Sequence, residues 1–241
     1  MLITWVSRKG LKRFKNNDAV ALYENNKIFI AIAVDAAEKN NTSHESDLAK
    51  YWANAVIAEC NFRIDSTSML KIDINEIVAI LREKQKNLRH NYLHETASYA
   101  VVFLDKELQV VTTLHCGDCL FGSQKNAPSI NWLIKPHNTY QQHMQLLAAG
   151  CQCHSHAYSR FTLTRYLNAR RFYTPELNEF PITDMEQLIL STDGYWAEHI
   201  GERIAWEKLE DDASVLRINL SEEKTLDMQS DCENFVTYTI Y

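Results

Sequence analysis

The chain has 241 residues, of which 46% are hydrophobic and 23% are charged, and its formal net charge at pH 7 is −6. This length and composition are typical of a single globular domain, residues 1–241, and argue against long disordered tracts. The negative charge, without any basic block, disfavours nucleic-acid binding. No apolar run reaches the roughly 18–20 residues that cross a bilayer, and the first residues lack the pattern of a signal peptide. We therefore expect a cytoplasmic protein that binds neither nucleic acid nor a membrane.

Alternating apolar residues and β-branched residues predict strands in the early, middle and late parts of the chain. The expected strands cover residues 2–7, 19–23, 27–34, 98–104, 109–115, 120–123, 131–134, 187–192, 213–220 and 234–240. Between the early and middle strands the spacing of apolar residues predicts two helices, at 45–62 and at 74–92, the second with Asp73 as its N-cap. A third helix is expected over 140–149, ended by Gly150, with shorter helical pieces at 163–167 and 204–209.

The order of these elements predicts the fold class. Strands in hairpins, then a helical pair, then more hairpins indicate one α+β domain. Two central antiparallel β-sheets flanked by α-helices, an αββα sandwich, would satisfy this order.

Aspartates recur at the ends of the predicted strands. The stretch LILSTDGYWAEH places Asp193 after a buried run; alone, Asp193-Gly194 would be read as a turn, since this dipeptide is common in turns. However, Asp18 precedes the second strand, Asp35 ends the third, and Asp211 precedes a late one. Carboxylates brought together in this way repel one another unless they share cations. Oxygen ligands favour hard divalent ions such as Mg²⁺ or Mn²⁺.

Five motifs resemble those of one known family. KRFKNND, AVDAA, HCGDC, STDGYW and DDASV occur in the order and at about the spacing found in the PPM-type (type 2C) metal-dependent Ser/Thr protein phosphatases. The resemblance covers roughly residues 8–220. It identifies the chain as a divergent, bacterial member and implies a metal-dependent phosphatase whose substrate is a phosphoserine or phosphothreonine protein, with a cognate Ser/Thr kinase as its counterpart.

The resemblance also implies roles for individual residues. Arg13 matches the phosphate-binding arginine, and Asp35 the aspartate that bridges two Mn²⁺ or Mg²⁺ ions. The remaining metal ligands would be Asp18, the backbone carbonyl of Ala36, Asp193 and Asp211, whereas Gly117-Asp118 matches a turn that is mainly structural. Two such ions lower the pKa of a water molecule that attacks phosphorus, so no side-chain nucleophile is required.

Departures from the family pattern leave other functions open. Asn17 replaces a glutamate, Asp212 replaces an asparagine, and Asp35-Ala36-Ala37-Glu38-Lys39 replaces a glycine-rich loop. A catalytically weakened or inactive regulatory module that binds a protein or phosphoprotein partner is the main alternative. Hydrolysis of a small phosphorylated metabolite is a third.

Two further stretches could carry chemistry. CQCHSH, residues 151–156, packs two cysteines and two histidines together, but a metal site of this type needs a second ligand pair elsewhere, so a polar turn is favoured. RRFYTPE, residues 170–176, could receive a phosphopeptide, although a solvated face is the simpler interpretation. The six cysteines show no disulfide framework, which fits a reducing compartment.

Overall fold

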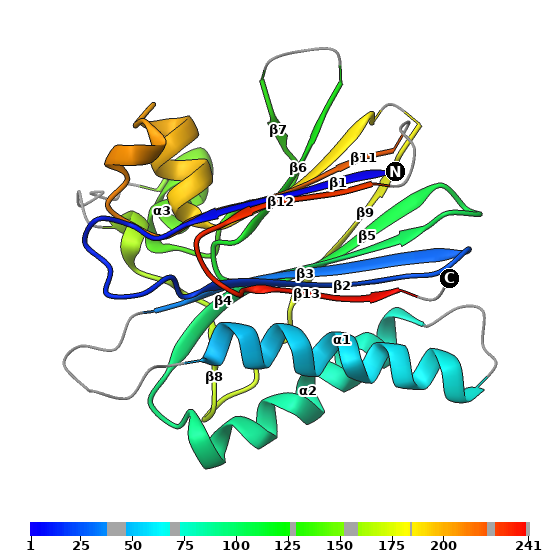
Figure 1. Ribbon diagram of the computed structural model, residues 1–241. Helices are drawn as coiled ribbons and strands as arrows, with labels where there is room; N and C mark the ends of the chain where they lie inside the picture. Colours follow the sequence, from blue (N-terminus) through cyan, green and yellow to red (C-terminus); the bar gives the residue numbers. More distant parts are fainter. Residues whose placement is uncertain are drawn as a thin grey trace.

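The structure is a computed structural model that describes residues 1–37, 47–67, 73–125, 129–151, 159–183, 185–220 and 225–239. The strands of these residues form two sheets that lie face to face (Figure 1). The six-stranded sheet has the order β12-β1-β11-β10-β6-β7, and the seven-stranded sheet the order β13-β2-β3-β4-β5-β9, with β8 paired to β4. The predicted αββα architecture is confirmed.

The first sheet contains strands from both ends of the chain. Its members are β1 (Leu2–Arg8), β6 (Leu120–Gln124), β7 (Asn131–Trp132), β10 (Gln187–Ser191), β11 (Ala213–Asn219) and β12 (Thr225–Ser230). The second sheet comprises β2 (Asp18–Glu24), β3 (Ile28–Ala36), β4 (Thr96–Asp105), β5 (Val110–Cys116), β8 (Leu167–Asn168), β9 (Glu176–Pro181) and β13 (Phe235–Thr239).

Helices α1 (Leu48–Thr67) and α2 (Ile74–Asn91) cover the outer face of the seven-stranded sheet (Figure 1). Trp52 and Val56 of α1 and Leu81 of α2 are fully buried against it. The predicted N-cap of α2 is confirmed as a capping box, in which Asp73 accepts from the first turn and Glu76 reaches back to the Asp73 N–H. None of the described helices is long and apolar enough to cross a membrane.

The other described helical segments are shorter than α1 and α2. They are α3 (Thr139–Ala148), the 3₁₀ turns η1 (Ser159–Phe161) and η3 (Trp206–Lys208), and the π-helix η2 (Gly194–Gly201). Tyr195 at the start of η2 packs against Ile189 and Val215 of the six-stranded sheet.

The core between the sheets fixes the register of the central strands. Trp5, Phe29, Phe121 and Leu190 meet there, all fully buried. Every residue of β2 is buried and all of β3 except Asp35, as expected for strands covered on both faces. A one-residue shift would move this apolar set to the wrong face, so the ends of β2 and β3 are set accurately.

Several local predictions were wrong. Residues 163–167, expected to be a helical piece, instead contain an isolated bridge at Leu163, a bend and the first residue of β8. The expected strand at 131–134 is only the two residues of β7. Strands β9 and β12 were not predicted. The sheets are also not purely antiparallel, because β12 pairs in parallel with β1 and β13 in parallel with β2.

Candidate metal centre

Two of the predicted aspartates lie side by side at one end of the seven-stranded sheet. Asp18 opens β2, Asp35 stands one residue before the end of β3, and the two are direct partners across the antiparallel pair. Asp18 is buried, whereas Asp35 is partly exposed. Next to them, Ala36 ends β3 and donates its N–H to the carbonyl of Asn17 at 3.1 Å. The hairpin therefore brings two carboxylates to the same edge.

The six-stranded sheet brings its own acids to meet this pair. Asp193 follows β10 and precedes η2, where burial and then the charges of Asp118, Asp211 and Asp18 raise its pKa. Thr192, one residue earlier, donates its hydroxyl to Asp18 Oδ2 at 2.8 Å. Acids separated by up to 175 positions in the chain are thus in one cluster, which spans both sheets.

Asp118 is a further member of the cluster that the sequence analysis had assigned to a structural turn. Its burial raises its pKa, and its charge in turn raises the pKa values of Asp35 and Asp193. Ser98 donates to Asp118 Oδ1 at 2.6 Å, and the Trp196 indole N–H donates to the Asp118 carbonyl at 2.8 Å. Its position in a glycine turn between two buried strands was the signal that could have identified it.

Gly117 allows this turn to approach β4. Its φ is +110°, and a Cβ at this position would lie 2.2 Å from the Ser98 hydroxyl. Only glycine fits such a backbone and such a contact. The glycine is therefore what places the Asp118 carboxyl group within reach of Ser98.

The carboxyl groups of the cluster resist ionisation. Burial, followed by repulsion from neighbouring acids, raises the pKa values of Asp18 and Asp35 well above their usual range, and the same holds for Asp193. The raised pKa values favour the protonated, neutral form of these carboxyl groups over the charged form.

Arg13 and Asp211 form the charged corner of the site. The Arg13 Nε and Nη2 atoms donate to the two oxygens of Asp211, each at 2.5 Å. This bidentate pairing raises the guanidinium pKa, and both side chains are partly exposed. The predicted phosphate-binding arginine and one predicted metal ligand are therefore in direct contact with each other.

Asp212 binds backbone N–H groups, whereas Asp211 pairs with Arg13. Its two oxygens accept the backbone N–H groups of Gly10 at 2.9 Å and Asn17 at 2.8 Å, so it joins the start of β11 to the loop before β2. Burial raises the pKa of Asp212 to about 6. Asn17 is buried, and its Nδ2 donates to the Lys15 carbonyl at 3.3 Å. No carboxylate replaces the missing glutamate at this position.

One oxygen of the cluster has no protein partner. Asp18 Oδ1 is buried and finds no hydrogen-bond partner among the described residues. Buried polar atoms are almost always paired, so such an atom needs a ligand. Several carboxyl groups around one buried acceptor form an all-oxygen donor set, which fits Mg²⁺ or Mn²⁺.

A second group of ionisable side chains lies on β5, on β9 and before α3. Ligand atoms of His115, His137 and Glu176 lie within 4.8 Å of one another, a spacing that could hold a metal ion. The two imidazole rings, however, are stacked nearly parallel, 4.3 Å apart, and His137 Nδ1 accepts the Gly117 N–H at 3.2 Å. Its Nε2 then carries the proton that is shared with Glu176 at 3.1 Å. In this arrangement the group holds the Gly117 turn rather than an ion.

The remaining predictions concern the surroundings. Residues 152–156 of the CQCHSH stretch lie outside the described residues, and Cys151 is exposed and free. The solvated-face interpretation of residues 170–176 was wrong in part, because Phe172 and Tyr173 pack against the core and Glu176 begins β9. Cysteines 60, 116, 119, 151 and 232 form no disulfide.

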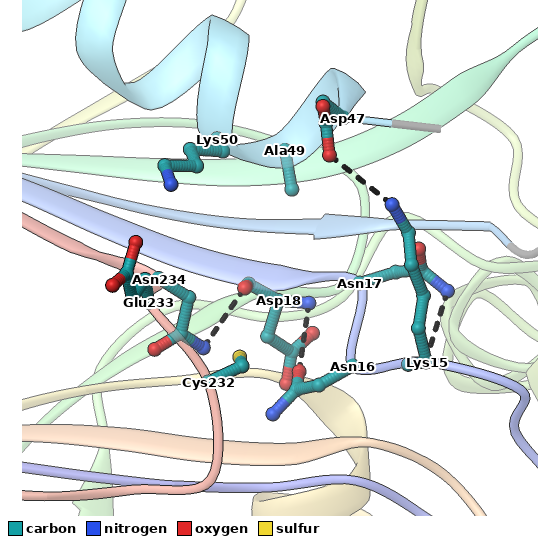
Figure 2. A pocket seen from close by; sticks show the side chains of 10 residues that line it. All are labelled: Lys15, Asn16, Asn17, Asp18, Asp47, Ala49, Lys50, Cys232, Glu233 and Asn234. Carbon is teal, nitrogen blue, oxygen red and sulfur yellow. Dashed lines mark hydrogen bonds and ion pairs between the residues drawn. The ribbon is translucent and has the colours of Figure 1, made fainter. Parts of the chain in front are cut away.

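Two cavities border the cluster. One, of about 240 Å³, lies beside Asp18 and is lined by the loop before β2, the start of α1 and the turn before β13 (Figure 2). The other, of about 20 Å³, is bounded by Asp118, Asp193, Trp196 and Arg160.

No protein-family model matches the chain, and neither does any curated protein. Solved structures do. A crystal structure of a bacterial serine phosphatase is 14% identical with a TM-score of 0.68, covering 92% of this chain and 99% of that one. The serine/threonine phosphatase Stp1 from Staphylococcus aureus is also 14% identical, with a TM-score of 0.69 and coverage of 91% and 95%.

A third similar structure is the catalytic domain of the serine/threonine protein phosphatase PstP in complex with two manganese ions. It is 14% identical with a TM-score of 0.60, covering 90% of this chain and 96% of that one. Each of these matches spans almost the entire length of both chains. The fold of this chain is therefore that of the PPM-type Ser/Thr phosphatases.

Proposed function

We propose that the chain is a Mg²⁺- or Mn²⁺-dependent protein phosphatase that hydrolyses phosphoserine or phosphothreonine. The observation that carries this proposal is the buried, unpartnered Asp18 Oδ1 within a cluster of acids drawn from both sheets. Asp18, Asp35, Asp193, Asp211 and the Ala36 carbonyl would hold two ions, with Asp118 beside them. The similarity to phosphatase structures, one with two manganese ions, supports the same chemistry.

Divalent cations held there would supply Lewis-acid chemistry and lower the pKa of a water molecule. The side chains of this protein have other tasks. Arg13 would bind the phosphoryl oxygens through the two parallel N–H groups that now contact Asp211. The partly exposed faces of Asp35 and Asp193 make the cluster accessible from solvent. Cys119, fully buried beside the acids, has a pKa raised well above its usual range, chiefly by burial, so its thiol is no nucleophile.

The substrate would be a phosphorylated protein, and its counterpart a Ser/Thr kinase of the same cell. Nothing in the acid cluster excludes a small phosphorylated metabolite, so a substrate panel should include both. We place the protein in the cytoplasm, in keeping with its free cysteines.

The test is hydrolysis of p-nitrophenyl phosphate and of a phosphothreonine peptide, with Mn²⁺ and with EDTA. Activity should require Mn²⁺ and should fall by more than about 100-fold in Asp193→Asn, since even the loss of a residue that only orients a metal ligand lowers affinity or activity about 10- to 100-fold. Asp105→Asn is the matched control. Asp105 ends β4 at the opposite end of the sheet, where it accepts the N–H groups of Glu107 and Leu108. Metal-dependent turnover that survives in Asp193→Asn would remove the proposal.

A non-catalytic regulatory module is the second candidate, and two observations favour it. Asp211 is already neutralised by Arg13, and Asn17 supplies no carboxylate. Calorimetric titration with Mn²⁺ separates the two functions. A phosphatase should bind two ions, whereas a module that recognises a partner by its surface should bind one or none.

A further inference from the structure

The chain crosses from one sheet to the other immediately beside Asp18. Strand β12 lies parallel to β1 in the six-stranded sheet, and β13 lies parallel to β2 in the seven-stranded sheet. Residues 231–234 connect them. Three of these four residues are exposed, but Asn234 is only 4% exposed.

The side-chain amide of Asn234 makes hydrogen bonds through both its nitrogen and its oxygen. Its Nδ2 donates to Ser7 Oγ at 2.7 Å and to the Asp18 carbonyl at 3.0 Å. Its Oδ1 accepts from Trp5 Nε1 at 3.0 Å and lies 2.8 Å from Ser230 Oγ, whose single proton is shared with the Cys232 carbonyl at 2.9 Å. Both donors of the amide and at least one lone pair of its oxygen therefore have a partner.

The partners fix which way the amide points. The Trp5 indole can only donate, and the Asp18 carbonyl can only accept, so a flipped amide would lose both bonds. The Asn234 backbone adds another link, since its carbonyl accepts the Val20 N–H at 2.9 Å. One buried residue thereby joins β1, β2 and the end of β12.

A second path leads from Asn234 to the Asp18 carboxyl group. Ser7 Oγ accepts from the amides of both Asn234 and Asn16, the latter at 2.8 Å. Its own proton is therefore directed to Ser214 Oγ, 2.7 Å away. Ser214 in turn donates its backbone N–H to Thr192 Oγ1 at 2.9 Å, and Thr192 donates its hydroxyl to Asp18 Oδ2 at 2.8 Å. Figure 2 shows the direct contact, a hydrogen bond from the Asn234 amide to the Asp18 backbone carbonyl.

We infer that Asn234 is a positioning residue for the metal centre: it fixes the backbone of Asp18 directly and orients the Asp18 carboxylate through Ser7 and Ser214. The inference rests on the proposed function, because it presumes that Asp18 holds an ion. It assigns to the crossover between the two edge strands a part in metal binding that the sequence alone did not indicate. Asn234 touches no substrate and is not a catalytic residue.

The experiment compares Mn²⁺ affinity, by calorimetry, in wild type, Asn234→Ala and Asn168→Ala. Asn168 is a matched control, because it is also buried and its Oδ1 accepts two backbone N–H groups, of Arg170 and Arg171, away from the acids. Both variants should lose thermal stability. Only Asn234→Ala should bind Mn²⁺ more weakly, by roughly 10- to 100-fold, the usual effect of removing a residue that orients a metal ligand. Its turnover should recover at saturating Mn²⁺.

Ser7→Ala keeps the inference testable if Asn234→Ala does not fold. This variant leaves the amide in place and breaks only the hydroxyl path, so it should weaken Mn²⁺ binding as well. Wild-type affinity in a folded Asn234→Ala protein, or in Ser7→Ala where the first variant is unfolded, would overturn the inference and leave the proposed function intact. Failure of the wild-type protein to bind Mn²⁺ would instead remove the proposed function, and the inference with it.

Discussion

At the scale of single residues, Arg13 and Asp211 show how the cluster limits its own repulsion. Two charge-assisted hydrogen bonds, each of 2.5 Å, occupy both oxygens of the aspartate. The guanidinium thus neutralises one acid, while burial raises the pKa values of Asp18, Asp35 and Asp193 nearby. A phosphoryl group would compete with Asp211 for Arg13, and an incoming cation would compete with Arg13 for Asp211.

Removing the guanidinium should separate phosphate binding by Arg13 from metal binding by Asp211. In Arg13→Ala we expect kcat/KM for a phosphopeptide to fall about 10- to 100-fold, because a hydrogen bond to a charged group contributes about 1.5–3 kcal/mol. Mn²⁺ should bind at least as tightly as in wild type, since Asp211 is released. Arg13→Lys, which keeps the charge but not the bidentate geometry, should lie between the two in activity. Loss of Mn²⁺ binding in Arg13→Ala would show that the arginine holds Asp211 in place instead.

At the scale of elements, the start of η2 is packed directly onto the start of β11. A Cβ on Gly194 would lie 2.2 Å from the Asp212 carbonyl oxygen and 2.9 Å from its carbon. The glycine after Asp193 is therefore needed for close approach, not only for a turn. This contact couples the position of the loop that carries Asp193 to the position of the loop that carries Asp211.

A methyl group at this contact should disturb both loops. Gly194→Ala should lower the free energy of unfolding by about 1–3 kcal/mol, the usual cost of overpacking, and should weaken Mn²⁺ binding. Gly201→Ala, at the far end of η2, is the control, because its Cβ would meet only the Trp196 carbonyl oxygen at 3.3 Å. Urea denaturation and Mn²⁺ titration of both variants provide the measurement. Equal effects in the two variants would contradict the packing argument.

Elements also show what the sequence could and could not predict. Buried strands such as β3 and the capped helix α2 carry their signals in their own residues, namely a continuous apolar run and the Asp73–Glu76 capping box. Strands β9 and β12 are largely exposed, and they are strands because neighbours β5 and β1 offer hydrogen bonds. The sequence patterns of β9 and β12 give no information about these neighbouring strands. For the same reason, motifs indicated Asp18, Asp35, Asp193 and Asp211 as ligands and Asp118 only as part of a turn, whereas Asn234 became apparent only from tertiary contacts.

At the scale of the whole molecule, the acid cluster links stability to pH. An aspartate titrates near 3.9 in an unfolded chain, whereas Asp212 has a native pKa of about 6, and those of Asp18, Asp35 and Asp193 are also raised. These four carboxyl groups therefore hold more protons in the native state than in the unfolded state above pH 4. Their contribution to stability must then fall as pH rises through this window. His115, with a pKa lowered to about 4, and His137, also lowered, act in the opposite direction.

Comparing the Tm with and without Mn²⁺ at each pH separates the effect of the acids on stability from that of the histidines. We expect the gain in Tm on adding Mn²⁺ to be larger at pH 7.5 than at pH 5, because the cations replace the protons that the cluster loses. With Mn²⁺ at about 100 times its Kd, the stabilisation should be about 2.7 kcal/mol. Scanning calorimetry in EDTA and in MnCl₂ at both pH values measures this. A gain that is equal at the two pH values, or larger at pH 5, would count against a role for the carboxylates.

The crossover that contains Asn234 has a consequence for motion. It ties the edges of both layers together at the point where Asp18 sits, so any widening of the gap between the layers must displace that aspartate. Linkage is reciprocal: an ion that prefers the undisplaced aspartate also opposes the widening. Removing the ions should then loosen the edge strands β12 and β13 first, although both lie outside the five motifs that contain the acids.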